Sequence, residues 1–184
     1  MKNTLKRNAL KGVLLAATLF ASAAFCEVSY GSLTDARDGK TYKTVKIGSQ
    51  TWMAENLNYK AHQSFCYEDD PANCDKYGRL YMWAAAMDSA AVFSEGGKGC
   101  GEGEICHPVY PVRGVCPAGW HLPSDAEWDA LKRFVAGSLF GGVTYPVGYT
   151  LKSASGWEEN GNGSDAFGFE ALPAGRHYGH IYGG

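Results

Sequence analysis

Residues 119–131, GWHLPSDAEWDAL, contain the clearest structural signal in the chain. Ser124 and Glu127 have the three-residue spacing of a capping box, which marks the N-terminus of a helix. Asp125 lies in the first turn, where the helix dipole favours a carboxylate. Apolar residues then recur at helical spacing, namely Trp128, Leu131, Phe134 and Val135. The stretch therefore predicts a helix over residues 125–136 that packs an aromatic face on a core.

His121 lies just before this predicted helix and is a candidate functional residue. Beside Glu127 its imidazole could act as a base or a ligand, or it could simply form a hydrogen bond where the helix begins. No second histidine lies near it in the sequence, so we favour the structural interpretation and keep His121 as a candidate ligand contact. Capping also explains Ser124 and Glu127 without catalysis.

The composition indicates one small globular domain rich in turns. The chain has 184 residues, a formal net charge of -2, 24 glycines and 13% aromatic residues. This length supports a single hydrophobic core but not two domains. The charges are few and dispersed, so nothing in the composition points to a nucleic-acid partner.

Residues 1–23 have the organisation of a secretory signal peptide. Positive charges come first, an apolar run over residues 13–20 follows, and Ala21-Ser22-Ala23 fits a cleavage signal. The run is far shorter than the ~20 residues that span a bilayer, and no later segment is long enough. We therefore expect an exported protein without a transmembrane helix, located in the periplasm, at the outer surface or in the medium.

Cys26 raises the alternative of a lipid anchor. A bacterial lipoprotein signal usually has a small residue directly before the lipidated cysteine, and Phe25 occupies that position here. We favour simple cleavage and keep anchoring through Cys26 as the alternative. Residues 24–32 would then form a mobile N-terminal segment, and residues 33–184 a single domain.

The remaining cysteines predict two local disulfides, because export makes pairing the default. Cys66 and Cys74 flank the turn-rich loop YEDDPAN, and Cys100 and Cys106 flank GEGEI. These spacings are too wide for the usual zinc motifs. Cys116 is left without an obvious partner.

The rest of the chain predicts few regular elements. Residues 32–57 have the pattern of a three-stranded meander, and residues 82–91 that of a second helix. Residues 60–76 and 94–118 are predicted to be irregular loops, and residues 175–184 show no closing strand.

The tryptophans could form a platform for stacking sugars, although such residues more often fill a small core. Trp83 and Trp128 lie on predicted helix faces, so we assign them to the core. Trp157 and Tyr110 lie in predicted loops and are the better candidates for exposed ligand contacts.

Two oxygen-rich loops could coordinate Ca²⁺. One contains Glu55, Asn56 and Asn58, and the other contains Asn162 and Asp165. Asn and Asp side chains in loops more often bond their own backbone. We therefore predict no cofactor and no metal, keep Ca²⁺ as the alternative, and retain Asn162 and Asp165 as candidate ligand contacts.

Four blocks in order resemble the Fibrobacter succinogenes major paralogous domain family, namely DGKTYKTVKIGSQTWMAENLNY, CYEDDPANCDKYGRLYMWAAAM, GVCPAGWHLPSDAEWDAL and LKSASGWEENGNGSDAFGFEALPAGR. The resemblance covers about residues 35–184. It implies a bacterial exported protein of a kind that is often a lipoprotein or a module of a larger surface protein.

The LPSDAEW block is also similar to the formylglycine-generating sulfatase-modifying family. That resemblance implies an α+β fold of C-type-lectin-like type, with two helices, small twisted antiparallel sheets and long disulfide-stapled loops. It does not imply the activity, because the late cysteine pair of those enzymes has no match after Cys116.

The resembled family also implies that the C-terminal part of the domain is missing here. Its members usually continue past the ALPAGR block and end near a further cysteine. From this resemblance we expect Cys116 to be the partner of that absent cysteine and to be unpaired in this chain.

These observations leave three functional hypotheses. The leading one is an exported binding module for a cell-surface glycan or another envelope protein. The alternatives are an oxidase of the formylglycine-generating type and an inert structural or truncated paralogue. Fold analogy alone does not choose a ligand.

Overall fold

The computed structural model describes residues 28–138, 146–178 and 181–183. Within these residues the chain is a small α+β fold with three antiparallel sheets, four α-helices and two disulfides. The predicted signal peptide and the candidate lipidation residue Cys26 lie outside the described residues.

The predicted meander forms the main sheet, in the order β1-β2-β3. Its strands are antiparallel and comprise β1 (Ser29–Thr34), β2 (Thr41–Ile47) and β3 (Gln50–Met53). The first turn closes through a 2.8 Å bond from the Gly39 amide to the Asp35 carbonyl. Gly39 has a φ of 76°, which glycine adopts without steric cost.

One expectation about this sheet is wrong for the residues that the structure describes. We expected residues 24–32 to be a mobile segment, but β1 begins at Ser29 and pairs with β2 along its whole length, while residues 24–27 lie outside the described residues. The pairing explains the difference, since it satisfies the backbone of a segment whose side chains are mostly exposed.

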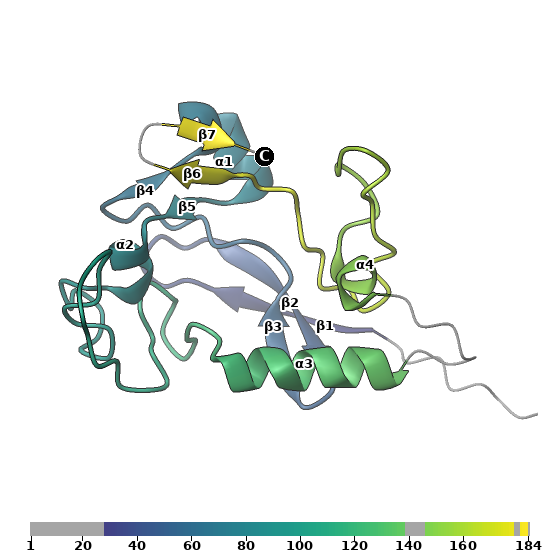
Figure 1. Cartoon of the computed structure of the whole chain (residues 1–184), viewed down its shortest axis with the longest axis horizontal. Coiled ribbons are helices and arrows are strands. Elements are labelled where there is room, and N and C mark those ends of the chain that lie inside the picture. The colour runs from purple at the N-terminus through teal and green to yellow at the C-terminus, as the bar shows by residue number, and fades with distance from the viewer. Residues whose placement is uncertain (1–27, 139–145, 179–180, 184) are drawn as a thin grey trace, which may run out of the picture.

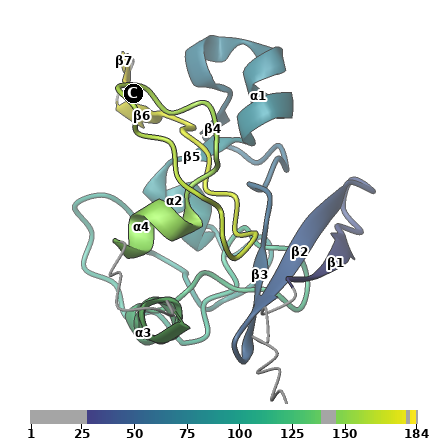
Figure 2. The ribbon, with the colours of Figure 1, turned by 90° about the vertical axis from the view of Figure 1, so that its right-hand side faces the viewer.

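The core lies between the main sheet and the helices α3 (Asp125–Ser138) and α4 (Val147–Leu151). Figure 1 shows α3 running alongside the strands, and Figure 2 shows it end-on beside the sheet. Leu131 and Val135 of α3 are fully buried against Val45 and Trp52. The helix predicted from the opening stretch is thus confirmed. Its predicted apolar face is only partly on the core, because Trp128 and Phe134 are 39% and 37% exposed.

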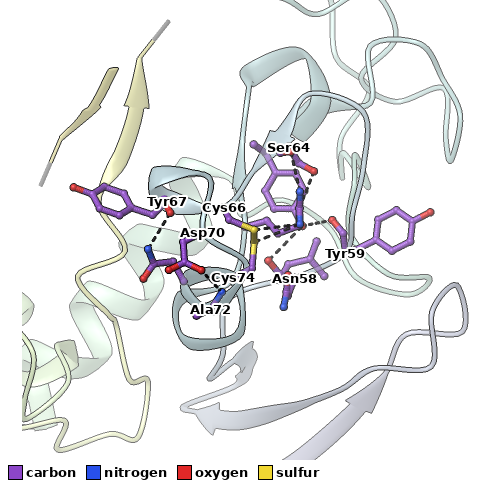
Figure 3. The surroundings of a disulfide bond; sticks show 12 residues. Asn58, Tyr59, Ser64, Cys66, Tyr67, Asp70, Ala72 and Cys74 are labelled. Atoms are coloured by element: carbon purple, nitrogen blue, oxygen red, sulfur yellow. Dashed lines mark hydrogen bonds between the residues drawn. A yellow bond between two sulfur atoms is a disulfide. The ribbon is translucent and has the colours of Figure 1, made fainter. Parts of the chain in front are cut away.

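A polar lobe formed by residues 58–81 was not expected to contain a helix. The structure places the 3-10 helix η1 (Tyr67–Asp69) and α1 (Pro71–Tyr77) there. Asp70 caps α1 by accepting a 2.9 Å bond from the Ala72 amide. The Cys66–Cys74 disulfide joins η1 to α1, as Figure 3 shows.

Arg79 connects two parts of this lobe, namely the disulfide and the small sheet formed by β4 (Ser64–Phe65) and β5 (Leu80–Tyr81). Its guanidinium donates to the Ser64 hydroxyl and to the Ser64 carbonyl, each at 2.9 Å. The same group lies 3.3 Å from the Cys74 sulfur. One planar side chain therefore holds the strand and the disulfide together.

The second predicted helix is shorter than expected. α2 (Trp83–Met87) ends at Asp88, which takes a left-handed conformation and accepts bonds from the amides of residues 92–94. Trp83 is 53% exposed, so its assignment to the core is wrong. A helix of five residues buries only one side, and the buried side of α2 carries Met87. Trp83 therefore remains exposed.

The stapled loop 94–118 packs a second small cluster around Met87, Cys100 and Val112. The Cys100–Cys106 disulfide closes part of it, as the spacing predicts. β6 (Arg176–Tyr178) and β7 (Ile181–Gly183) pair as antiparallel strands where we expected no closing strand. No helix within the described residues is long and apolar enough to cross a membrane.

Candidate functional site

A hollow on the described surface lies between the edge of the main sheet and the start of α3. We call it the aromatic groove, because tryptophan and phenylalanine rings form much of its wall. Its volume is about 740 Å³, within the range of ligand pockets. Its lining comprises residues 49–53, 55–57, 116, 119–123, 127–128 and 169–172.

The capping box fixes one end of the groove. The Glu127 carboxylate accepts 2.8 Å bonds from the Ser124 amide and from the Ser124 hydroxyl. In return, the Glu127 amide donates a 3.4 Å bond to Ser124 Oγ. Gln50 of β3 donates to the Glu127 carbonyl at 3.1 Å. These bonds attach the first turn of α3 to the edge of the sheet.

His121 extends this cap into the groove. Its Nε2 lies 2.8 Å from Glu127 Oε1. The bond from the Ser124 amide, followed by that from His121, holds the pKa of Glu127 down at about 2. The carboxylate therefore stays ionised at neutral pH and fixes the imidazole.

Trp52, Trp128 and Phe169 pack together in the apolar wall of the groove, which Trp120 also lines. Trp128 lies 4.8 Å from Trp52 between ring centroids, and Phe169 lies 5.8 Å from Trp52. Trp52 is almost fully buried, but Trp128 is 39% exposed. The assignment of Trp128 to the core is therefore only half right, because its ring lies on the core and also lines the groove.

Cys116 lines the groove at the end near two arginines. It is the free cysteine among the described residues. Burial raises the pKa of its thiol to about 11 in spite of the nearby guanidiniums of Arg37 and Arg113. A thiol held protonated at neutral pH is a weak nucleophile.

A second hollow of about 320 Å³ adjoins the aromatic groove. We call it the polar hollow, since lysines, acids and amides dominate its lining. The two hollows share Glu55, Asn56, Glu170 and Leu172 as a common wall. The two hollows are therefore contiguous.

Residues 45–182 match the model of the Fibrobacter succinogenes major domain family. The chain belongs to this family. The match covers most of the chain and includes every segment that lines the aromatic groove. Comparison with curated proteins and with solved structures found no match.

The structure does not bring together the candidate ligand contacts predicted for this family member. Of these five, only His121 lines the aromatic groove. Tyr110 is 67% exposed in the stapled loop. Trp157 is half-buried, with its Nε1 donating to the Ser153 hydroxyl at 3.0 Å and Lys152 over its ring.

In the two candidate Ca²⁺ loops, side-chain oxygens accept hydrogen bonds from backbone amides. Asn162 accepts a bond from the Trp157 amide at 3.0 Å, and Asp165 from the Glu170 amide at 2.8 Å. Glu55 accepts a bond from the Lys43 amide. The described residues contain no cluster of three or more His, Cys, Asp or Glu side chains that could hold a metal ion.

Sequence reasoning missed most of the groove in this family member. Phe169 comes from a segment distant from the one that carries Trp120 and Trp128, and no motif marks the three rings as one surface. The available signal was the position of Trp120 and Trp128 on either side of the capping box, which places both rings at the same helix terminus.

Proposed function

We propose that the chain is an exported binding module whose ligand occupies the aromatic groove. The observation that carries this proposal is the exposed face of Trp128, which lines a hollow of about 740 Å³ beside polar side chains. Exposed aromatic rings with a few polar groups are typical of binding sites for sugars and for protein segments. Both ligand classes fit a cell-envelope or extracellular module.

Two further features support the proposal. The two disulfides are typical of an oxidising compartment outside the cytoplasm. The combination of small antiparallel sheets, helices and stapled loops also fits the lectin-like fold that we propose for the chain. The proposed binding uses no metal and no other cofactor.

The test compares two tryptophan variants of the full chain on a glycan array and against a displayed library of random peptides. Trp128→Ala removes the groove wall, whereas Trp83→Ala removes a ring that is 53% exposed and outside the groove. We expect Trp128→Ala to weaken binding by tenfold or more, as for an aromatic residue at the centre of an interface. Trp83→Ala and added EDTA should leave binding unchanged.

Trp120→Ala provides a second variant in case Trp128→Ala unfolds the protein, because Trp120 lines the groove from the preceding loop. Binding that survives both groove variants in folded protein would contradict the proposal.

A further inference from the structure

The outer edge of β3 faces the aromatic groove without a partner strand. β3 is the last strand of the sheet order β1-β2-β3, and residues 49–53 line the groove. The bond from the Ala54 amide to the Lys43 carbonyl fixes which peptide groups point toward β2. Since bonding alternates along an antiparallel pair, the peptide groups of Thr51 and Met53 point away from β2.

These outward groups have no hydrogen-bond partner among the described residues. A free strand edge is a template for an added strand, and partner polypeptides often bind in this way. Sugar hydroxyls can bond to single groups of this row, whereas an extended polypeptide backbone matches the spacing of the whole row. The edge therefore favours a polypeptide ligand.

The charges of the groove lining indicate which charge the polypeptide ligand carries. Glu55, Glu127 and Glu170 line the aromatic groove, and no lysine or arginine does so within the described residues. Lys43 approaches Glu170 at 3.5 Å from the sheet. Its single charge leaves the lining with a net negative charge.

The two guanidiniums near Cys116 do not change this net charge. Arg37 is paired with Asp35 at 2.6 Å. Arg113 donates to the carbonyls of Phe93 and Cys116. Neither guanidinium lines the groove, so a bound cation would meet carboxylates and ring faces.

From these observations we propose that the aromatic groove binds an extended, basic segment of a partner polypeptide, which adds a strand to the free edge of β3. A lysine or arginine of the segment lies beside Glu55 and Glu170, and its apolar stem or an apolar neighbour lies on Trp128. The polar hollow adjoins the groove through Glu55 and Glu170, but Lys40 and Lys76 also line it, so we place the basic residues of the segment in the aromatic groove. This inference rests on the proposed function and names its ligand class.

The experiment pans a displayed library of random dodecapeptides on the full chain and measures the affinity of the enriched peptides as synthetic probes. We expect enrichment of lysine and arginine next to an aromatic or aliphatic residue. The double variant Glu55→Gln with Glu170→Gln should weaken these peptides by roughly tenfold. Glu104→Gln is the control, because it also removes one carboxylate charge but lies on the stapled loop, outside both hollows. It should leave the affinity of the peptides unchanged.

The addition of a strand is tested by changing the peptide instead of the protein. The result then does not depend on whether a protein variant folds. N-methylation at alternate residues of an enriched peptide should abolish binding in one register and be tolerated in the other, because only every second amide faces β3. Thr51→Pro provides the matching change on the protein, since it removes an outward amide without removing a bond to β2.

Three outcomes are distinguished. Cation-biased binding that needs Trp128 and shows the N-methyl alternation supports the inference. Binding that needs Trp128 but shows no charge bias or no alternation, or that is confined to neutral glycans, overturns the inference and leaves the proposed function standing. Absence of any binding that depends on Trp128 or Trp120 overturns both.

Discussion

At the scale of single residues, Glu127 does the most to organise the candidate site. Its carboxylate contacts Ser124 twice and His121 once, and its main-chain carbonyl accepts a bond from Gln50. Loss of its charge would therefore loosen the helix cap and the imidazole together, while the bond from Gln50 to its main-chain carbonyl would remain.

We expect the contribution of Glu127 to the free energy of unfolding to depend on pH. Its pKa is about 2 in the fold against an ordinary 4.5, so the stabilisation is complete above about pH 4.5 and is lost as the pH falls toward 2. At neutral pH Glu127→Gln should cost about 1 kcal/mol, since a side chain that is 36% exposed is screened by solvent.

Urea denaturation between pH 7 and pH 2 measures this dependence. Asp125→Asn is the matched control, because Asp125 lies in the same first turn and has no side-chain bond in the described structure. The wild type should lose more stability than Glu127→Gln on acidification, while Asp125→Asn should follow the wild type. Parallel curves for wild type and Glu127→Gln would contradict this role.

At the scale of elements, the lobe of η1 and α1 depends on a cross-link more than on a core. Only Cys74 of α1 is buried, and η1 has no buried residue. Replacing Cys66 and Cys74 together by alanine should therefore lower the free energy of unfolding by about 2–3 kcal/mol through the entropy of the opened loop. Urea denaturation followed by far-UV circular dichroism measures the loss.

Arg79 provides the comparison for this lobe, because it bonds the strand and touches both sulfurs. Arg79→Met in the protein with the disulfide intact should cost less than the double cysteine replacement. The opposite order would show that the guanidinium, rather than the disulfide, holds the lobe.

Elements with local signals were predictable from the sequence. The capping box, the glycine turns of the meander and the two short cysteine loops each depend on residues within about ten positions. α1 was missed although Asp70, Pro71 and Gly78 mark both of its ends. Its polar sequence lacks the apolar periodicity on which the prediction depended.

Features that need several segments were not predictable in this way. Whether Trp83 and Trp128 are covered depends on which distant segments pack over them, and both differ from the prediction. The aromatic groove combines residues from the sheet edge, the loop before α3 and the segment after residue 168. No spacing within one segment can indicate that combination.

At the scale of the whole molecule, a buried ion pair joins the first hairpin to the stapled loop. Asp35 is 1% exposed and pairs with Arg37 at 2.6 Å. Arg37 also donates to the Val115 carbonyl at 2.9 Å and lies over the rings of Tyr59 and Phe93. These contacts connect parts of the chain that no regular element joins, including the loop that carries Cys116.

We expect Asp35→Asn to lower the free energy of unfolding by about 3 kcal/mol or more, because it leaves the half-buried guanidinium of Arg37 without its counter-charge. Arg37→Met leaves the Asp35 carboxylate buried and unpaired, and should cost a similar amount. The double variant should cost clearly less than the two single changes together, since it leaves neither charge behind. Urea denaturation of the four proteins gives the coupling energy.

The sign of the pH dependence provides an independent check on this pair. The hydrogen bonds and charge of Arg37 lower the pKa of Asp35, so the pair stabilises the fold at neutral pH and loses its effect as acid protonates the carboxyl. Asp35→Asn should therefore flatten the acid limb of the stability curve relative to the wild type. Additive costs in the double variant, with an unchanged acid limb, would show that the hairpin and the stapled loop are held by packing on Tyr59 and Phe93 instead.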